Sequence, residues 1–144
     1  MAKLEGLKII DYGCGSGILA VAAVLLGAKC AWAVDIDPQA LQATRDNARR
    51  NGVGQRIEAL VPEALTVTGV DLLVANILAN PLIDLAPRLA GLVRQGGRFA
   101  LAGVLADQAG RVAAAFEPWF TLDPVQCRGE WARLTGRRTP APVD

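Results

Sequence analysis

Short apolar runs and amphipathic segments alternate along the chain. Each apolar run ends at a glycine, proline or polar turn, which is typical of buried strands, and the segments between the runs repeat apolar residues at helical spacing. Strands are expected over residues 8–12, 31–34, 57–61, 70–75, 99–104, 121–127 and 130–135. Helices are expected over residues 18–26, 38–51, 81–93 and 107–116.

This order predicts an α/β protein with an open, mostly parallel sheet. Strand and helix alternate through most of the chain, and the last two strands are adjacent, which indicates an antiparallel edge hairpin. We expect one domain over residues 1–136 and a disordered tail over 137–144. Ligands of such sheets bind beyond the carboxyl ends of the strands, so the residues at those ends are the candidates for a site.

Residue types at the helix ends refine the boundaries. Asp37 followed by Pro38 is the usual pair for an N-cap and a first helical turn. Asn80 is expected to cap the helix at 81–93, because it directly precedes a proline. The helix at 18–26 is apolar on nearly all sides, so we expect it to be buried against the sheet.

The composition excludes several classes of chemistry. The 144 residues include no histidine, so there is no Ser-His-Asp triad, Cys-His pair or histidine general base, and we expect no metal site. The formal net charge of +1 argues against a phosphate-binding surface for nucleic acid. The three cysteines form no CxxC pair and no segment has the length of a membrane span, which favours a soluble protein of the reducing cytoplasm.

A glycine-rich turn between the first strand and the first helix is the strongest local signal. Gly13, Gly15 and Gly17 let the backbone turn sharply and come close to a ligand. No Gly-Lys-Ser/Thr follows, which excludes a P-loop. The dinucleotide fingerprint fails as well, because Ile18 stands where it needs glycine or alanine.

Two acidic residues give this turn its expected ligand. A carboxylate at Asp11 suits a cation better than a pyrophosphate, and S-adenosylmethionine carries both an ammonium and a sulfonium. Asp35, at the end of the second strand, is placed to accept hydrogen bonds from ribose hydroxyls. The alternative makes Asp11 a turn-forming residue and Asp35 a solvated strand end. Both acids together with the glycines favour the adenosylmethionine site.

Asn76 follows the fourth strand and is the candidate for contact with a reacting amine. Its side-chain carbonyl can accept a hydrogen bond from an amine, and its NH2 can donate to a cofactor. The alternative is a helix cap, a role that suits Asn80 better. The aromatic residues Trp119, Phe120 and Trp131 are interpreted as core, and Cys14 lies in a loop with no neighbouring base to activate it.

Several segments together resemble the catalytic domain of the bacterial ribosomal protein lysine methyltransferases, which modify protein eleven of the large ribosomal subunit. The resemblance covers about residues 5–138 and is most specific in the fourth and last of its segments. The segments are IIDYGCGSGILA, VDIDPQAL, DNARRNGV, VANILANPL, LAPRLAGLV and EWARLTGR.

The resemblance implies a Rossmann-like class I methyltransferase fold with seven strands and helices on both faces of the sheet. It implies S-adenosylmethionine as cofactor and, as targets, lysine ε-amino groups and the α-amino terminus of the ribosomal protein. It also implies a monomer without direct nucleic-acid contact, and a family N-terminal recognition domain that is absent here. The expected catalytic residue is Asn76, and the expected cofactor-binding residues are Asp11, Gly13, Gly15, Gly17, Asp35, Ile36 and Asn76.

Three other functions remain as alternatives. The chain could be an isolated cofactor-binding module without activity of its own. It could be an amide or adenine-amine methyltransferase, although those typically show Asn-Pro-Pro-Tyr where this chain has Asn-Ile-Leu-Ala at 76–79. A nicotinamide oxidoreductase is disfavoured by Asp11 and Ile18.

Overall fold

The computed structural model describes residues 4–140. The chain divides into two compact units, Met1–Val70 and Asp71–Asp144, which are described in turn. Eight strands and four α-helices alternate along the described residues, and this order confirms the α/β fold class. No helix within 4–140 is long and apolar enough to cross a membrane.

The first unit contains three parallel strands in the order β3-β2-β1. They are β1 (Lys8–Tyr12), β2 (Cys30–Val34) and β3 (Ile57–Leu60), and short 3₁₀ turns at Gly54–Arg56 and Pro62–Ala64 flank β3. The buried residues of β1 and β2 are almost all apolar, as expected for strands covered by packed helices.

The helices of this unit are α1 (Ile18–Leu25) and α2 (Pro38–Arg50), and both pack on its strands and on each other. The expectation that α1 is buried against the sheet is confirmed for one face of the helix. Its small residues Ala20 and Ala23 are buried, but Ile18 and Leu25 are 68% and 57% exposed. One face of α1 therefore meets the strands and α2, whereas Ile18 and Leu25 lie on its exposed side.

The start of α2 confirms the expected cap. The Asp37 carboxylate accepts a hydrogen bond from the Gln39 N–H at 2.9 Å, and Pro38 is the first helical residue. The helix ends at Arg50, and Gly52 follows with a φ of 72°, a conformation that glycine adopts without strain.

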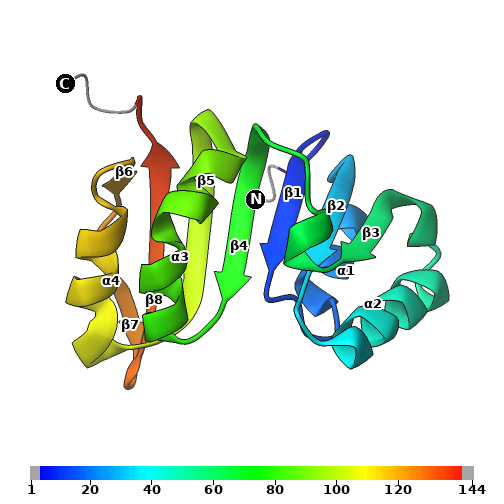
Figure 1. Ribbon diagram of the computed structural model, residues 1–144, viewed down its shortest axis with the longest axis horizontal. Coiled ribbons are helices and arrows are strands. Elements are labelled where there is room, and N and C mark those ends of the chain that lie inside the picture. Colours follow the sequence, from blue (N-terminus) through cyan, green and yellow to red (C-terminus); the bar gives the residue numbers. More distant parts are fainter. Residues whose placement is uncertain (1–3, 141–144) are drawn as a thin grey trace. The chain divides into compact units, whose positions relative to one another are not determined.

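The second unit combines two α-helices with the remaining strands. In chain order it contains β4 (Val70–Asn76), α3 (Ala79–Leu92), β5 (Val93–Leu105), a 3₁₀ turn at Ala106–Gln108, α4 (Ala109–Phe116), β6 (Phe120–Leu122), β7 (Gln126–Arg128) and β8 (Trp131–Arg138). Strand β8 is antiparallel to β5, β6 and β7. The helices α3 and α4 lie side by side, against β5 and β8 respectively (Figure 1).

The predicted start of α3 needs correction. The helix begins at Ala79, its N-cap residue Leu78 makes no side-chain capping bond, and Asn80 lies inside the first turn. Pro81 is tolerated there because the N–H groups of a first turn have no intrahelical acceptor. The Asn80 side chain instead accepts a hydrogen bond from Arg111 at 3.3 Å.

Strand β5 is longer than the predicted 99–104 and includes Gly96 and Gly97. A Cβ at Gly97 would lie 3.1 Å from the Asp71 carbonyl oxygen and 2.7 Å from Val93 Cγ1. The absent side chain therefore lets the strand begin directly after α3, in close contact with β4.

The predicted strand at 121–127 is two short strands, β6 and β7. Residues 123–125, which include Pro124, separate them, and a proline cannot donate to the ladder. Both short strands pair with β8, and β7 and β8 form the predicted antiparallel hairpin.

Strand β8 continues through Arg138, whose guanidinium donates to the Ala90 carbonyl at 2.9 Å, so the predicted tail at 137–144 does not begin at 137. Its last residues, 141–144, lie outside the described residues.

Three phenylalanines fill the core of the second unit. The Phe99 and Phe120 rings stack with their centroids 4.3 Å apart, and Phe116 lies 5.2 Å from Phe99. Phe120 is core, as the sequence predicts, and Trp119 is half-buried. The same prediction is wrong for Trp131, which is 52% exposed.

Replacing Phe116 by alanine tests this cluster. Phe116 is fully buried against the Phe99 and Phe120 rings, so Phe116→Ala should lower the free energy of unfolding by about 3–5 kcal/mol. The matched control is Leu25→Ala at a mostly exposed helical position, which should change it by less than about 0.5 kcal/mol. Urea unfolding curves measure both, and equal effects would contradict the assignment of this core.

Candidate functional site

The glycine loop joins β1 to α1 in the first unit. Gly13, Gly15 and Gly17 have φ values of 76°, 57° and 81°, a region that side chains other than glycine rarely adopt. A Cβ at Gly15 would meet no atom within 4 Å, so the loop is open on that side. A ligand could therefore approach the backbone atoms of this loop without meeting glycine side chains.

Asp11 lies below this loop, at the carboxyl end of β1, and is only 1% exposed. Its carboxylate accepts a hydrogen bond from the Ala20 N–H, in the first turn of α1, at 3.2 Å. The N-cap residue of that helix is Gly17, which has no side chain, so Asp11 supplies the capping oxygen from a neighbouring strand. Contact between Asp11 and a cofactor ammonium stays a prediction.

Burial raises the pKa of Asp11 to about 6. The hydrogen bond from Ala20 opposes this shift, and the negative charge of Asp35 adds to it. The folded protein therefore holds a proton on Asp11 at pH values where the unfolded chain has lost it.

Asp35 connects the glycine loop to β2. One carboxylate oxygen accepts from the Gly15 N–H at 2.9 Å, and the other accepts from the Asp37 N–H at 3.0 Å. Next to it, Ile36 is 80% exposed, an unusual position for an isoleucine side chain. The structure thus brings Asp35, Ile36 and the glycine loop together in the first unit.

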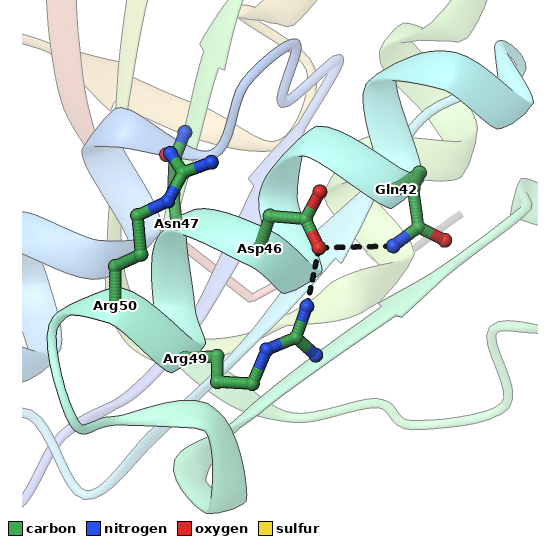
Figure 2. A network of polar contacts seen from close by, with 5 residues as sticks. All are labelled: Gln42, Asp46, Asn47, Arg49 and Arg50. Atoms are coloured by element: carbon green, nitrogen blue, oxygen red, sulfur yellow. Dashed lines mark hydrogen bonds and ion pairs between the residues drawn. The ribbon is translucent and has the colours of Figure 1, made fainter.

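Two residues of α2 that the sequence reasoning missed hold the loop from its other side. Thr44 donates to the Gly15 carbonyl at 3.0 Å, and Asn47 donates to the Ser16 carbonyl at 2.9 Å. Figure 2 shows Asn47 beside Arg50 on the same helix. The sequence did carry one signal for this role: Thr44 and Asn47 are three residues apart, which places two polar side chains on one face of the helix.

Cys14 is buried in this loop, and its Sγ lies 3.5 Å from Thr44 Oγ1. Burial raises the pKa of the Cys14 thiol to about 11. A thiol with so high a pKa is not a nucleophile at neutral pH, which agrees with the absence of a neighbouring base in the sequence.

Asn76 is the last residue of β4, in the second unit, beside an irregularity in β5. The register of β5 against β8 shifts between Leu101 and Val104. Within this bulge, Gly103 has a φ of 84°, and a Cβ on it would lie 2.8 Å from the Asn76 side-chain oxygen. The bulge and the missing side chain make room for Asn76. Sequence reasoning did not find Gly103, because nothing local marks a bulge there.

A pocket of about 960 Å³ opens beside Asn76. Its lining comes entirely from the second unit: Asn76, Ile77, Leu78, Ala102, Gly103, Gln126, Cys127, Arg128, Trp131, Ala132 and Arg133. The lining combines apolar side chains with two arginines and includes no carboxylate. Leu78 and Trp131, both largely exposed, form part of its wall.

Comparison with known proteins identifies the family. The family model described as ribosomal protein L11 methyltransferase (PrmA) matches residues 1–139. The chain belongs to this family. Ribosomal protein L11 methyltransferases of Pseudomonas putida (strain W619) and Pseudomonas aeruginosa (strain LESB58) are 55% and 56% identical to it over 137 residues each. These alignments cover 94% of the chain and 47% of the relatives, so the chain spans about half the length of these family members.

Solved structures agree with this assignment. The ribosomal protein L11 methylase of Lactobacillus delbrueckii subsp. bulgaricus superposes with a TM-score of 0.84 and 34% identity, over 96% of this chain and 73% of that one. An RNA methyltransferase of Salinibacter ruber, solved with S-adenosyl-L-homocysteine, superposes with a TM-score of 0.77 over 99% of this chain and 89% of that one. Its identity is 16%, so it shows the fold alone. The predicted Rossmann-like methyltransferase fold is confirmed.

The raised pKa of Asp11 predicts a specific pH dependence of stability. Its value is 3.8 in the unfolded chain and about 6 in the folded one, so the folded state binds more protons between these values. The contribution of Asp11 to the free energy of unfolding therefore falls as the pH rises through this window, by roughly 3 kcal/mol in all. Asp11→Asn removes the titration, so the stability of the variant relative to the unsubstituted chain should increase from pH 4 to pH 6.

Asp123 provides a control of opposite sign. Hydrogen bonds from Thr135 and Arg98 and the charge of Arg98 lower its pKa, so its contribution is lost as the pH falls. Urea unfolding of Asp11→Asn and Asp123→Asn at several pH values measures both effects. A stability difference for Asp11→Asn that does not change between pH 4 and pH 6 would contradict the assignment.

Proposed function

We propose that this chain carries the catalytic part of an S-adenosylmethionine-dependent protein N-methyltransferase. Its targets are the lysine ε-amino groups and the N-terminal α-amino group of ribosomal protein L11. The observation that carries the proposal is the match of nearly the whole chain to this family, together with an open glycine loop held by Asp35. The enzyme works in the cytoplasm as a monomer, without direct nucleic-acid contact.

The first unit fits the cofactor. Gly15 leaves open space beside the loop, the carboxylate of Asp35 offers further lone pairs to ribose hydroxyls, and the exposed Ile36 offers an apolar surface to a purine ring. When bound, S-adenosylmethionine would supply a sulfonium methyl group for transfer to an amine, with S-adenosylhomocysteine as the leaving group. Gly13, Gly15, Gly17, Asp35 and Ile36 are the binding residues, with Asp11 supporting α1.

Asn76 is proposed to align the incoming amine. Methyl transfer forms an N–C bond while the S–C bond breaks, and the amine must arrive neutral, with its lone pair directed at the methyl carbon about 3–3.5 Å away. The Asn76 carbonyl accepts an N–H of the amine and fixes this direction. The chain contains no histidine, and the released proton passes to solvent.

The pocket beside Asn76 suits a lysine side chain. Leu78, Ile77 and Trp131 provide apolar contact for the methylene groups. The guanidinium groups of Arg128 and Arg133 and the low polarity of the wall both lower the pKa of an entering ammonium, which favours the neutral amine. A substrate lysine can therefore lose its proton without a general base.

Calorimetry tests the cofactor. S-adenosylmethionine and S-adenosylhomocysteine should both bind the chain, and NAD should not. Binding of NAD but of neither adenosyl compound would refute the proposal. A labelled-methyl assay on ribosomal protein L11 then tests transfer, and cofactor binding without transfer would make the chain a cofactor-binding module, the alternative left open by the sequence.

Asn76→Ala tests the alignment of the amine. Because the lost hydrogen bond only orients the nucleophile, the rate of methyl transfer should fall by about 100-fold while the affinity for S-adenosylhomocysteine stays within about threefold. The control is Asn80→Ala, four residues along the chain, where the side chain accepts a hydrogen bond from Arg111 and both quantities should hold. An unchanged rate in Asn76→Ala would show that Asn76 does not align the amine.

A further inference from the structure

Thr44 contacts the glycine loop from a fully buried position on α2. Its hydroxyl donates to the Gly15 carbonyl at 3.0 Å, and the Cys14 sulfur lies 3.5 Å from the Thr44 hydroxyl oxygen. A Cβ at Gly17 would lie 2.6 Å from the Thr44 methyl group, so the loop packs directly on this side chain. Thr44 thus fixes the loop by both a hydrogen bond and contact.

Asn47, one turn further along α2, holds the next peptide group. Its NH2 donates to the Ser16 carbonyl at 2.9 Å, and its side-chain oxygen accepts from Arg50 at 3.1 Å. Figure 2 shows Arg50 reaching back along the helix to Asn47, whereas Arg49 is directed to Asp46. Arg50 therefore fixes the orientation of the Asn47 amide.

These bonds determine where the loop amides point. In a trans peptide the C=O and the following N–H point in opposite directions, and the described residues contain no cis peptide. Because the Gly15 carbonyl points at Thr44, the Ser16 N–H points away from α2. Within residues 4–140 no acceptor for the Ser16 N–H is found, whereas Gly15 donates to Asp35 and Gly17 to the Cys14 carbonyl.

We propose that Thr44 and Asn47 are positioning residues that hold the glycine loop so that the Ser16 N–H is ready to bond an acceptor of the cofactor. The inference rests on the proposed function, because it takes the loop as the site of adenosylmethionine. An amide held in its binding orientation before the ligand arrives loses less conformational freedom on binding. The two side chains therefore act on cofactor affinity and not on the transfer step.

Thr44 allows a test that separates orientation from packing. Thr44→Val keeps the shape but removes the hydroxyl, and Thr44→Ser keeps the hydroxyl but removes a methyl group. Thr44→Val should weaken S-adenosylhomocysteine binding by about tenfold and raise KM for the cofactor equally, with kcat unchanged. Thr44→Ser should bind within about twofold of the unsubstituted chain, although the lost buried methyl lowers its Tm.

Arg50→Ala and Arg49→Ala form a second matched pair on α2. Arg50→Ala frees the Asn47 amide to rotate and should weaken binding by about threefold. Arg49→Ala removes only an exposed ion pair with Asp46 and should leave binding unchanged. Asn47→Ala should weaken binding at least as much as Arg50→Ala.

Calorimetry with S-adenosylhomocysteine decides the outcome. Equal affinities for Thr44→Val and Thr44→Ser, or an Asn47→Ala variant that binds as tightly as Arg49→Ala, would overturn the inference. An unsubstituted chain that does not bind S-adenosylhomocysteine would instead refute the proposed function. The two failures are therefore distinguishable in one series of titrations.

Discussion

The glycine loop after β1 has no side chains with which to fix its own shape, and this constraint governs the first unit. Three of its residues are glycines with positive φ values, and because glycine adopts positive and negative φ about equally well, neighbouring groups must select this conformation. The neighbours are Asp35, which binds a loop amide, and Thr44 and Asn47, which bind loop carbonyls. The end of β2 and one face of α2 thus depend on the same few hydrogen bonds as the candidate site.

The same arrangement explains the buried charge. Gly17 begins α1 and has no side chain with which to cap it, so the carboxylate of Asp11 caps the helix from β1. Burial of that carboxylate raises its pKa, an unfavourable effect that the hydrogen bond from Ala20 opposes. A loop of bare backbone is therefore maintained by polar groups placed on the three elements around it.

In the second unit, an irregular strand and a glycine make room for the candidate site residue. Asn76 ends β4 where a bulge in β5 and the absent side chain of Gly103 leave room for it. Bulges are frequent beside functional sites, where they change the direction of a side chain. Trp131, in the hairpin of β7 and β8, forms part of the wall of the pocket beside Asn76. Its side chain is therefore exposed and is not part of the core.

The sequence predicted the features that depend on local chemistry. The Asp37-Pro38 cap, the glycine loop and the strand-helix alternation follow from residue types a few positions apart, and all are present. Asn80 was misassigned because a proline is tolerated throughout the first helical turn and not only at its first residue. The helix therefore begins at Ala79, two residues before Pro81. The roles of Thr44, Asn47, Gly103 and Trp131 arise from contacts between distant segments, which no local pattern records.

The central claim is that the glycine loop binds the adenosyl cofactor through amides whose directions are set before binding. Amide NMR spectra of the chain, recorded while S-adenosylhomocysteine is added, test it most directly. The account predicts that the Ser16 amide resonance shifts and its hydrogen exchange slows on saturation, while the amides of Gly13 and Gly17, already bonded to carbonyls, keep their exchange rates within about threefold. Saturable binding that leaves the Ser16 amide unshifted and its exchange unchanged would contradict it.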